Sequence, residues 1–248
     1  MKTRRVVKWY AAVAALAVGT AVVSAQETSR PMIVSTNPAI GARDIDPALA
    51  EISVTFDQDM GSGFSWTGGG EVYPETTGSP YWLDSRTCVL PVALQRGRFY
   101  RVGVNSRSHQ NFRSVAGAPA PPRVIHFCTQ GAPAEELAWL TPPEVLEVVP
   151  ADGATAVDPA LPEIRITFSQ PMGGGRSLTG GGEKYPPFDE SRELTWSDDR
   201  RTIIWPVRLA PNHAYRFGIN SFSHINFMSE RGVPVTPRRI QFQTGPGQ

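Results

Sequence analysis

The sequence is poor in the residues that usually build metal and redox sites. Its 248 residues include only two cysteines and four histidines. His109 and His224 are far apart in the chain, His126 and His213 are isolated, and no cysteine or histidine cluster has the spacing of a zinc site. We therefore predict neither a metal site nor a cofactor.

Long apolar segments are missing beyond the N-terminus. Residues 1–25 begin with four basic residues, continue as a mostly apolar run from Trp9 to Val23, and end in small residues. This pattern predicts a secretory signal peptide, with an uncleaved N-terminal anchor as the alternative. No later run approaches the roughly 18 apolar residues of a membrane helix. We therefore expect a secreted protein of the periplasm or cell surface, with no membrane span after cleavage.

An excess of charge of either sign is absent as well. The chain has 24 basic and 23 acidic residues. Loss of residues 1–25 would remove four basic and no acidic residues, which leaves 20 against 23 and a formal net charge of −3. This balance argues against nucleic acid as a partner.

Two cysteines in an exported protein could form a disulfide. Cys88 alternates with Leu90 and Val92 on an apolar, inward face. Cys128 alternates with His126 and Val124 on a face that we expect to point outward. Residues on opposite faces of their sheets seldom reach the short Cα separation that a disulfide needs. The sequence leaves two alternatives, a disulfide or one buried and one exposed thiol.

Glycine and proline, in contrast, are abundant at 23 residues each, and one long segment occurs twice. EISVTFDQDMGSGFSWTGGGEVYP begins at Glu51 and returns 112 residues later as EIRITFSQPMGGGRSLTGGGEKYP from Glu163, without a gap. A period of this length fits a whole small domain. The sequence predicts a signal peptide at residues 1–25, a first domain at 26–131, a linker at 132–143 and a second domain at 144–248.

The pattern within each copy predicts a β-sandwich. Ile52, Val54 and Phe56 alternate with polar residues, as their counterparts do at 164–168. A leucine, then a Gly or Asn, then Tyr100 or Tyr215 resembles the tyrosine corner of immunoglobulin-like sandwiches. About seven short strands in each copy match that fold in number. The predicted fold class is all-β, two tandem immunoglobulin-like β-sandwiches.

Proline at both ends stiffens the predicted linker. We expect one helical turn over Glu135–Leu140. Trp139 and Leu140 are costly to expose to water, so we expect them to pack against a domain and to limit hinge motion.

Residues 148–172, VVPADGATAVDPALPEIRITFSQPM, resemble the bacterial Ig-like domain of the S-layer (SbsA) type. That family opens with a Pro-x-x-Gly turn, continues through a Val/Ile-Asp-Pro step, and ends an alternating strand in Phe-Ser-x-x-Met. The first copy keeps this pattern with substitutions, so the resemblance covers both copies. It implies a β-sandwich module of exported and surface proteins that acts as a spacer or interaction domain. It supplies no catalytic residues.

The repeated triple glycine, at residues 68–70 and 180–182, could be read as a phosphate-binding loop. Neither copy has the Gly-x-Gly-x-x-Gly or Gly-Lys-Ser/Thr context that such a loop needs. We therefore predict a bend in which glycine permits positive φ or a close approach of the backbone.

Ser108 beside His109 could suggest a hydrolase. No acidic residue lies in that stretch to orient the histidine. The repeated segments that begin at Asn105 and Asn220 favour turns that satisfy their own backbone, with Phe112 and Phe227 in the core. We predict no catalytic residues.

Calcium is the one metal that the first copy could attract. Convergence of Asp44, Asp46, Asp57 and Asp59 on such an ion is the functional alternative, because oxygen-rich loops suit calcium. The second copy keeps only Asp158 of this set. Solvated turn acids are the favoured interpretation.

The candidate ligand or partner surface consists of three aromatic residues of the first copy, Trp66, Tyr73 and Tyr81. Flat aromatic rings stack well on sugars and on partner proteins. Trp82 is predicted to lie in the core. Trp66 precedes the glycines and is replaced by Leu178 in the second copy, which makes it the better surface candidate.

The sequence thus predicts an exported, non-enzymatic Ig-like module that binds, adheres or acts as a spacer. Its expected partner is an envelope protein or a glycan. The alternatives are a carbohydrate-binding accessory protein that uses the aromatics of the first domain, and an exported hydrolase.

Overall fold

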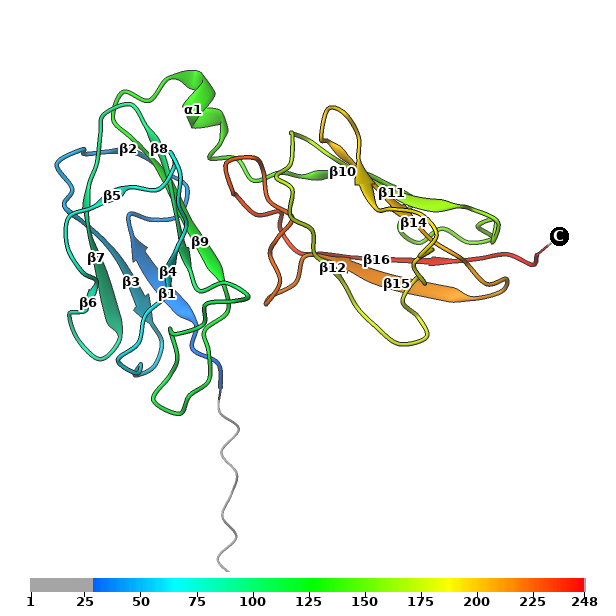
Figure 1. Ribbon diagram of the computed structural model, residues 1–248, viewed down its shortest axis with the longest axis horizontal. Coiled ribbons are helices and arrows are strands. Elements are labelled where there is room, and N and C mark those ends of the chain that lie inside the picture. Colours follow the sequence, from blue (N-terminus) through cyan, green and yellow to red (C-terminus); the bar gives the residue numbers. More distant parts are fainter. Residues whose placement is uncertain (1–28, 248) are drawn as a thin grey trace, which may run out of the picture.

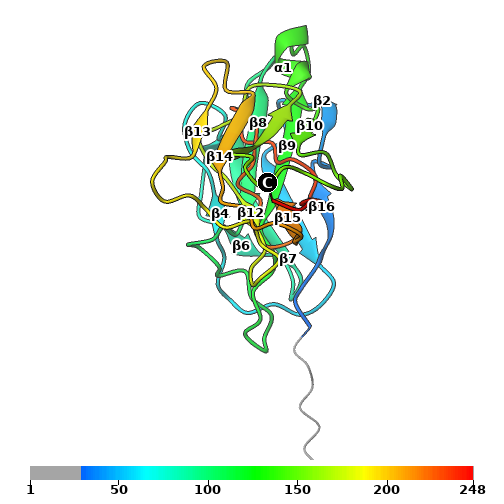
Figure 2. The same cartoon turned by 90° about the vertical axis from the view of Figure 1, so that its right-hand side faces the viewer.

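The computed structural model describes residues 29–247, and the predicted signal peptide lies outside them. Residues 29–131, here called the N-terminal half, form the lobe on the left of Figure 1. Residues 144–247, the C-terminal half, form the lobe on the right, and the two follow one another along the long axis. Figure 2 looks along that axis with the C-terminal half in front. No helix of the described residues is long and apolar enough to cross a membrane.

The N-terminal half contains two sheets that enclose one core. Its strands are β1 Ile33–Asn37, β2 Ala42–Ile45, β3 Glu51–Phe56, β4 Trp66–Thr67, β5 Glu75–Thr76, β6 Tyr81–Trp82, β7 Thr87–Ala93, β8 Phe99–Val104 and β9 Arg123–Thr129. One sheet has the order β1-β3-β7-β5 with β6 also on β7, and the other has the order β2-β9-β8-β4. Ile52, Val54 and Phe56 of β3 share a core with Val102 of β8 and Ile125 of β9. The predicted inward face of β3 is confirmed.

The C-terminal half repeats this arrangement. Its strands are β10 Val145–Val149, β11 Glu163–Phe168, β12 Leu178–Thr179, β13 Thr195–Trp196, β14 Thr202–Pro206, β15 Ala214–Ile219 and β16 Arg238–Gln243. They form sheets of order β10-β11-β14-β13 and β12-β15-β16. Ile164 and Ile166 of β11 share a core with Phe217 of β15 and Ile240 of β16. Because pairs of sheets face each other across apolar cores, the fold is all-β and immunoglobulin-like, as predicted.

A tyrosine corner closes each sandwich. The Tyr100 hydroxyl accepts the Gln95 N–H at 2.8 Å, and the Tyr215 hydroxyl accepts the Ala210 N–H at 2.7 Å. Between donor and tyrosine, Gly97 and Asn212 take positive φ, at 77° and 50°. This confirms both the predicted corner and the reason for a Gly or Asn before each tyrosine.

The segment between the halves packs against the N-terminal half. It contains the one helix of the described residues, α1 Ala134–Ala138. Leu140 is buried in a small apolar cluster with Phe99, Cys128 and Val233, and Trp139 packs against the same cluster. The expected packing of Trp139 and Leu140 is therefore confirmed.

One expectation about β9 is wrong. Its outward side chains Val124, His126 and Cys128 are all buried, although the alternation points them away from the sandwich core. The cause is tertiary, because α1, Leu140 and Val233 of the C-terminal half cover this face. The exposed thiol expected at Cys128 is consequently buried, and Cys88 and Cys128 are both free. Burial raises the pKa of each thiol to about 11.

Candidate functional site

Trp66, the preferred surface candidate, is partly buried rather than free in solvent. It lies in β4, paired opposite Val104 of β8. Its ring meets Phe112 edge-on, with ring centroids 5.4 Å apart, and packs against the core of the N-terminal half. Only part of the indole surface is therefore available to a ligand.

The triple glycine beside Trp66 makes room for Tyr73. Gly68 has φ of 148°, and a Cβ atom built there would overlap the Tyr73 ring. In the second copy, a Cβ atom on Gly180 would lie 2.7 Å from the Tyr185 ring. Gly70 and Gly182 each take φ of 71° in the bend that follows. The predicted structural role of the glycines, positive φ and close approach, is confirmed.

Trp66 and Tyr73 line one hollow of about 320 Å³ together with His109 and Asn111. We call this the aromatic hollow. Tyr81 is not among its lining residues; its hydroxyl donates to the Glu51 carboxylate at 2.7 Å. That hydrogen bond raises the pKa of Tyr81. The structure thus brings two of the three candidate residues together, and ligand binding by them stays a prediction.

The serine–histidine pairs form turns. The Ser108 hydroxyl lies 3.0 Å from Nδ1 of His109, and the Ser223 hydroxyl lies 3.0 Å from Nδ1 of His224. Among the described residues, no carboxylate hydrogen-bonds either histidine. The geometry lacks the third group that orients a catalytic histidine.

Asparagine side chains hold the same turns from the inside. Asn105 donates to the carbonyls of Phe112 and Ala120 at 3.0 and 2.8 Å, and accepts the Phe112 N–H at 3.1 Å. Asn220 repeats these bonds with Phe227 and Val235. Phe112 and Phe227 are fully buried, so the predicted structural role of these segments is confirmed.

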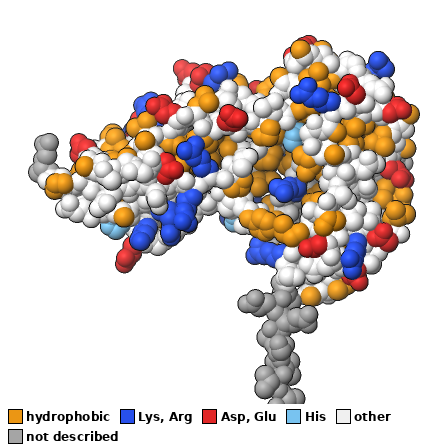
Figure 3. Space-filling model, turned by 180° about the vertical axis from the view of Figure 1, so that it is seen from behind, with side chains coloured by type: hydrophobic (Ala, Val, Ile, Leu, Met, Phe, Trp, Pro, Cys, Tyr) orange, Lys and Arg blue, Asp and Glu red, His pale blue; other side chains and the backbone are white. Residues whose placement is uncertain are grey.

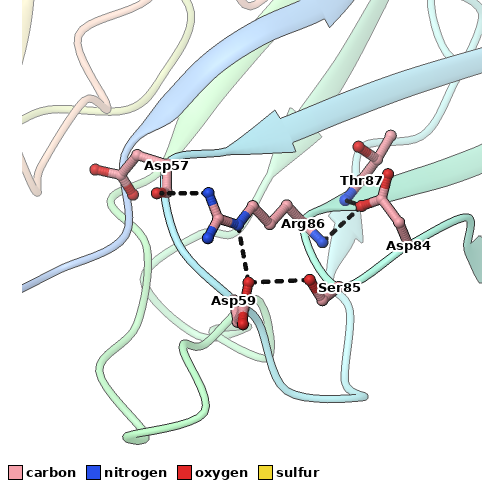
Figure 4. A network of polar contacts seen from close by, with 6 residues as sticks. All are labelled: Asp57, Asp59, Asp84, Ser85, Arg86 and Thr87. Carbon is pink, nitrogen blue, oxygen red and sulfur yellow. Dashed lines mark hydrogen bonds and ion pairs between the residues drawn. The ribbon is translucent and has the colours of Figure 1, made fainter.

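Of the first-copy aspartates, Asp59 belongs to a network of surface hydrogen bonds (Figure 4). Asp59 accepts from Arg86 at 2.8 Å and from Ser85 at 2.9 Å. The hydrogen bond from Arg86 is the main reason why the pKa of Asp59 is lowered. Asp46 accepts the Ala48 N–H at 2.9 Å, as a turn acid does. Nowhere in residues 29–247 do three or more His, Cys, Asp or Glu residues gather as a metal site would require.

The surface that sequence reasoning missed lies between the two halves. Arg101 of β8 donates to the Gly232 carbonyl at 3.4 Å, across the boundary. In the reverse direction, Arg231 lies 3.8 Å from the Glu136 carboxylate and 5.8 Å from the centre of the Trp139 ring. Glu136 also accepts the Phe99 N–H at 3.1 Å, so the contact is continuous from β8 to the C-terminal half.

A cavity of about 400 Å³ opens beside this contact, lined by prolines and by apolar residues that include Ile40, Val124, Phe222 and Val233. Figure 3 shows hydrophobic side chains gathered in the hollow between the two lobes. His126 also lines the cavity, with Nε2 3.3 Å from the Leu140 carbonyl. Burial lowers the pKa of His126, and the charge of nearby Arg101 lowers it further.

A signal for this contact is present in the sequence. Val72, Phe99, Val124 and Cys128 are apolar on the outer face of the first copy, whereas the second copy has polar residues or alanine at these positions. Such a difference between otherwise similar copies identifies the face that is covered.

Comparison with protein-family models supports an Ig-like domain in the second half of the chain. Residues 140–244 match a protein-family model described as a bacterial Ig-like domain. Among solved structures, the chimeric titin Z1Z2 functionalized with a KLER exogenous peptide from decorin is 9% identical, with 88% of this chain and 97% of that chain covered and a TM-score of 0.26. The S-layer protein rSbsC(31-844) is 14% identical, with 87% and 26% covered and a TM-score of 0.25. No curated protein matched the chain.

Proposed function

We propose that the protein is an exported, non-enzymatic surface module in which two tandem Ig-like domains form a stiff spacer that presents a binding surface. The domains would be the two copies at residues 26–131 and 144–248, both of the S-layer type, joined by the linker at 132–143. The match of residues 140–244 to a bacterial Ig-like domain supports a surface-associated binding or spacer role.

The observation that carries the proposal is the contact between the halves. Phe99 and Cys128 of the first half, Leu140 of the linker and Val233 of the second half bury one another. Arg101 and Arg231 reach across the boundary from opposite sides. The linker packs against the first domain, and the second domain packs against the linker, so little hinge freedom is left. A stiff spacer requires such a restricted hinge.

Small-angle scattering tests the stiffness. Val233→Asp would place an unpaired charge in the buried contact, and we expect the largest dimension of the particle to increase because the halves separate. Proteases should then cut within residues 132–143. Val115→Asp is the matched control, because Val115 is 75% exposed. Circular dichroism establishes that both variants keep their sheets. A Val233→Asp profile that overlays the wild-type profile would show that the contact does not set the stiffness.

Export is tested separately. The full chain produced in a bacterial host should be recovered outside the cytoplasm, with a mature N-terminus at Gln26 by mass spectrometry. Recovery of the intact chain in the membrane fraction would instead support the uncleaved anchor.

The aromatic hollow favours a second candidate function, a carbohydrate-binding accessory protein. Trp66 and Tyr73 line it beside the polar side chains of His109 and Asn111, a combination that suits a sugar. Trp66→Leu is the most informative variant, because Leu178 occupies this position in the second copy, in a strand paired in the same way. Loss of binding on a glycan array with Trp66→Leu, but not with Tyr81→Phe, would support this role. An absence of glycan binding by the wild type would exclude it.

A further inference from the structure

The outer surface of the C-terminal sheet β12-β15-β16 carries a group of cations. We call Lys184, Arg216 and Arg239 the basic face; all three are exposed. Arg238, which is also exposed, borders the face at the start of β16, on the side of the strand that Ile240 and Phe242 share. Arg216 is paired with Gln241 and Arg239 with Gly218, so the two arginines are diagonal neighbours on adjacent strands, with about 7–8 Å between their Cα atoms. Lys184 lies on the other side of β15, because its carbonyl accepts the Arg216 N–H at 2.6 Å. In Figure 3, which is seen from behind, the C-terminal half lies on the left, and Lys and Arg side chains gather on its lower side.

No cation of the basic face forms an ion pair within the part of the chain that the structure describes. The ion pairs within residues 29–247 are formed by other arginines, namely Arg86, Arg165, Arg192, Arg200, Arg208 and Arg231. The Asp152 carboxylate, which accepts the Gln241 N–H at 3.0 Å, borders the face. Uncompensated cations on one surface repel one another and attract anions.

The equivalent surface of the N-terminal half keeps an arginine, Arg101, at the position of Arg216, but it is otherwise more apolar. There, Val72, Phe99, Val124 and Cys128 stand where the second copy has Lys184, Ala214, Arg239 and Gln243. The first surface is covered by the linker and by the C-terminal half. The surface of the C-terminal half lacks all four of those apolar side chains. It is therefore not suited to a second apolar contact of this kind. Its partner must instead be complementary to positive charge.

Two hollows meet at Arg216 and extend along the sheet. One, of about 480 Å³, is lined by Gly180, Gly181, Arg238 and Arg239 in addition to Arg216. The other, of about 250 Å³, is lined by Lys184, Gln241 and Gln243 on the far side of Arg216. The glycines present bare backbone, so a ligand can approach closely. This shape fits an extended ligand with repeated anionic groups.

We propose that the basic face binds an acidic polysaccharide whose repeated carboxylates pair with Arg216 and its neighbours. The guanidinium fork matches a carboxylate with two parallel hydrogen bonds, and glutamine side chains can bond sugar hydroxyls. Single-stranded nucleic acid would need exposed rings for base stacking, but Tyr215, Phe217 and Phe242 of these strands are buried. The inference deepens the proposed binding role by giving its partner class, and it rests on that role.

Fluorescence anisotropy with labelled polygalacturonate tests the inference on the full chain. We expect saturable binding that weakens as salt increases, because these interactions are screened. The Arg216→Glu/Arg239→Glu variant should bind at least about tenfold more weakly, since two charge-assisted contacts become repulsive. Arg43→Glu/Arg201→Glu is the matched control: both arginines are exposed, the change in net charge is equal, and neither side chain makes a hydrogen bond or ion pair within residues 29–247. Circular dichroism checks that both variants are folded, with Arg216→Gln/Arg239→Gln as the milder substitute.

Three results would overturn the inference: no binding of polygalacturonate by the wild type, equal weakening by both charge-reversal pairs, or tighter binding of single-stranded DNA than of polygalacturonate. Neutral dextran should not bind. Scattering separates this failure from failure of the stiff spacer, because neither Arg216 nor Arg239 belongs to the apolar cluster or to the arginine contacts that join the halves. Val233→Asp should, conversely, change the particle dimensions without removing polysaccharide binding.

Discussion

At the scale of single residues, His126 combines burial with a titratable ring. It is 4% exposed, it faces the Leu140 carbonyl, and the charge of Arg101 lies nearby. Protonation of this ring would place a second positive charge in a buried contact. The pKa of His126 is therefore lowered in the folded protein, mainly because burial disfavours the charged form.

This shift predicts a loss of stability in acid. The unfolded chain binds the proton near the ordinary histidine pKa of about 6.5, whereas the folded chain binds it only at lower pH. The stability that neutral His126 contributes is fully present above a pH of about 6.5. It is lost as the pH falls from there through the lower pKa of the folded protein. Urea unfolding followed by tryptophan fluorescence should show a smaller decrease from pH 7.5 to 5.0 for His126→Gln than for the wild type. His109→Gln, at an exposed site, should follow the wild type. An equal decrease in all three proteins would contradict the prediction.

At the scale of elements, the bend after β4 depends on a fit between one glycine and one ring. Gly68→Ala should destabilise the protein by about 1–3 kcal/mol, because the added methyl overlaps the Tyr73 ring. Gly70→Ala is the control for backbone strain alone. Gly70 has φ of 71°, but a Cβ atom there would meet no atom other than those of its chain neighbours within 4 Å. Gly68→Ala should cost less in a Tyr73→Ala background than in the wild type, because the overlapping ring is then gone. Additive effects in urea unfolding would show that the ring and the glycine do not interact.

The elements also show how far the sequence predicts this structure. The alternation of β3 and the Leu-to-Tyr segment before β8 are local patterns, and both gave the observed geometry. β2 was not anticipated, because its four residues lie in a turn-rich segment and pair in parallel with the distant β9. Of the candidate site residues, Trp66 and Tyr73 line one hollow and Tyr81 does not, and ligand binding by them stays a prediction. The core contact of Trp66 with Phe112 leaves no sign in local spacing. The burial of Cys128 depends on the other half of the chain, which no pattern within β9 can encode.

At the scale of the whole molecule, the two halves are similar in sequence but have different outer faces. In the first half this face is apolar and is buried by the linker and by Val233. In the second half it carries Lys184, Arg216 and Arg239 and stays exposed. The first face can therefore hold the molecule together while the second remains available to a partner. This division predicts that changes to one face leave the property of the other intact.

The contact between the halves should also couple their unfolding. Because Leu140 and Val233 are buried at the boundary and Arg101 and Arg231 cross it, neither half can unfold without exposing apolar surface of the other. We expect scanning calorimetry of the wild type to show one transition, with equal calorimetric and van't Hoff enthalpies. Arg101→Ala/Arg231→Ala should split it into two transitions, whereas Arg43→Ala/Arg201→Ala should not. Two separate transitions in the wild type would mean that the halves are energetically independent, and the stiffness proposed for the spacer would then lack its physical basis.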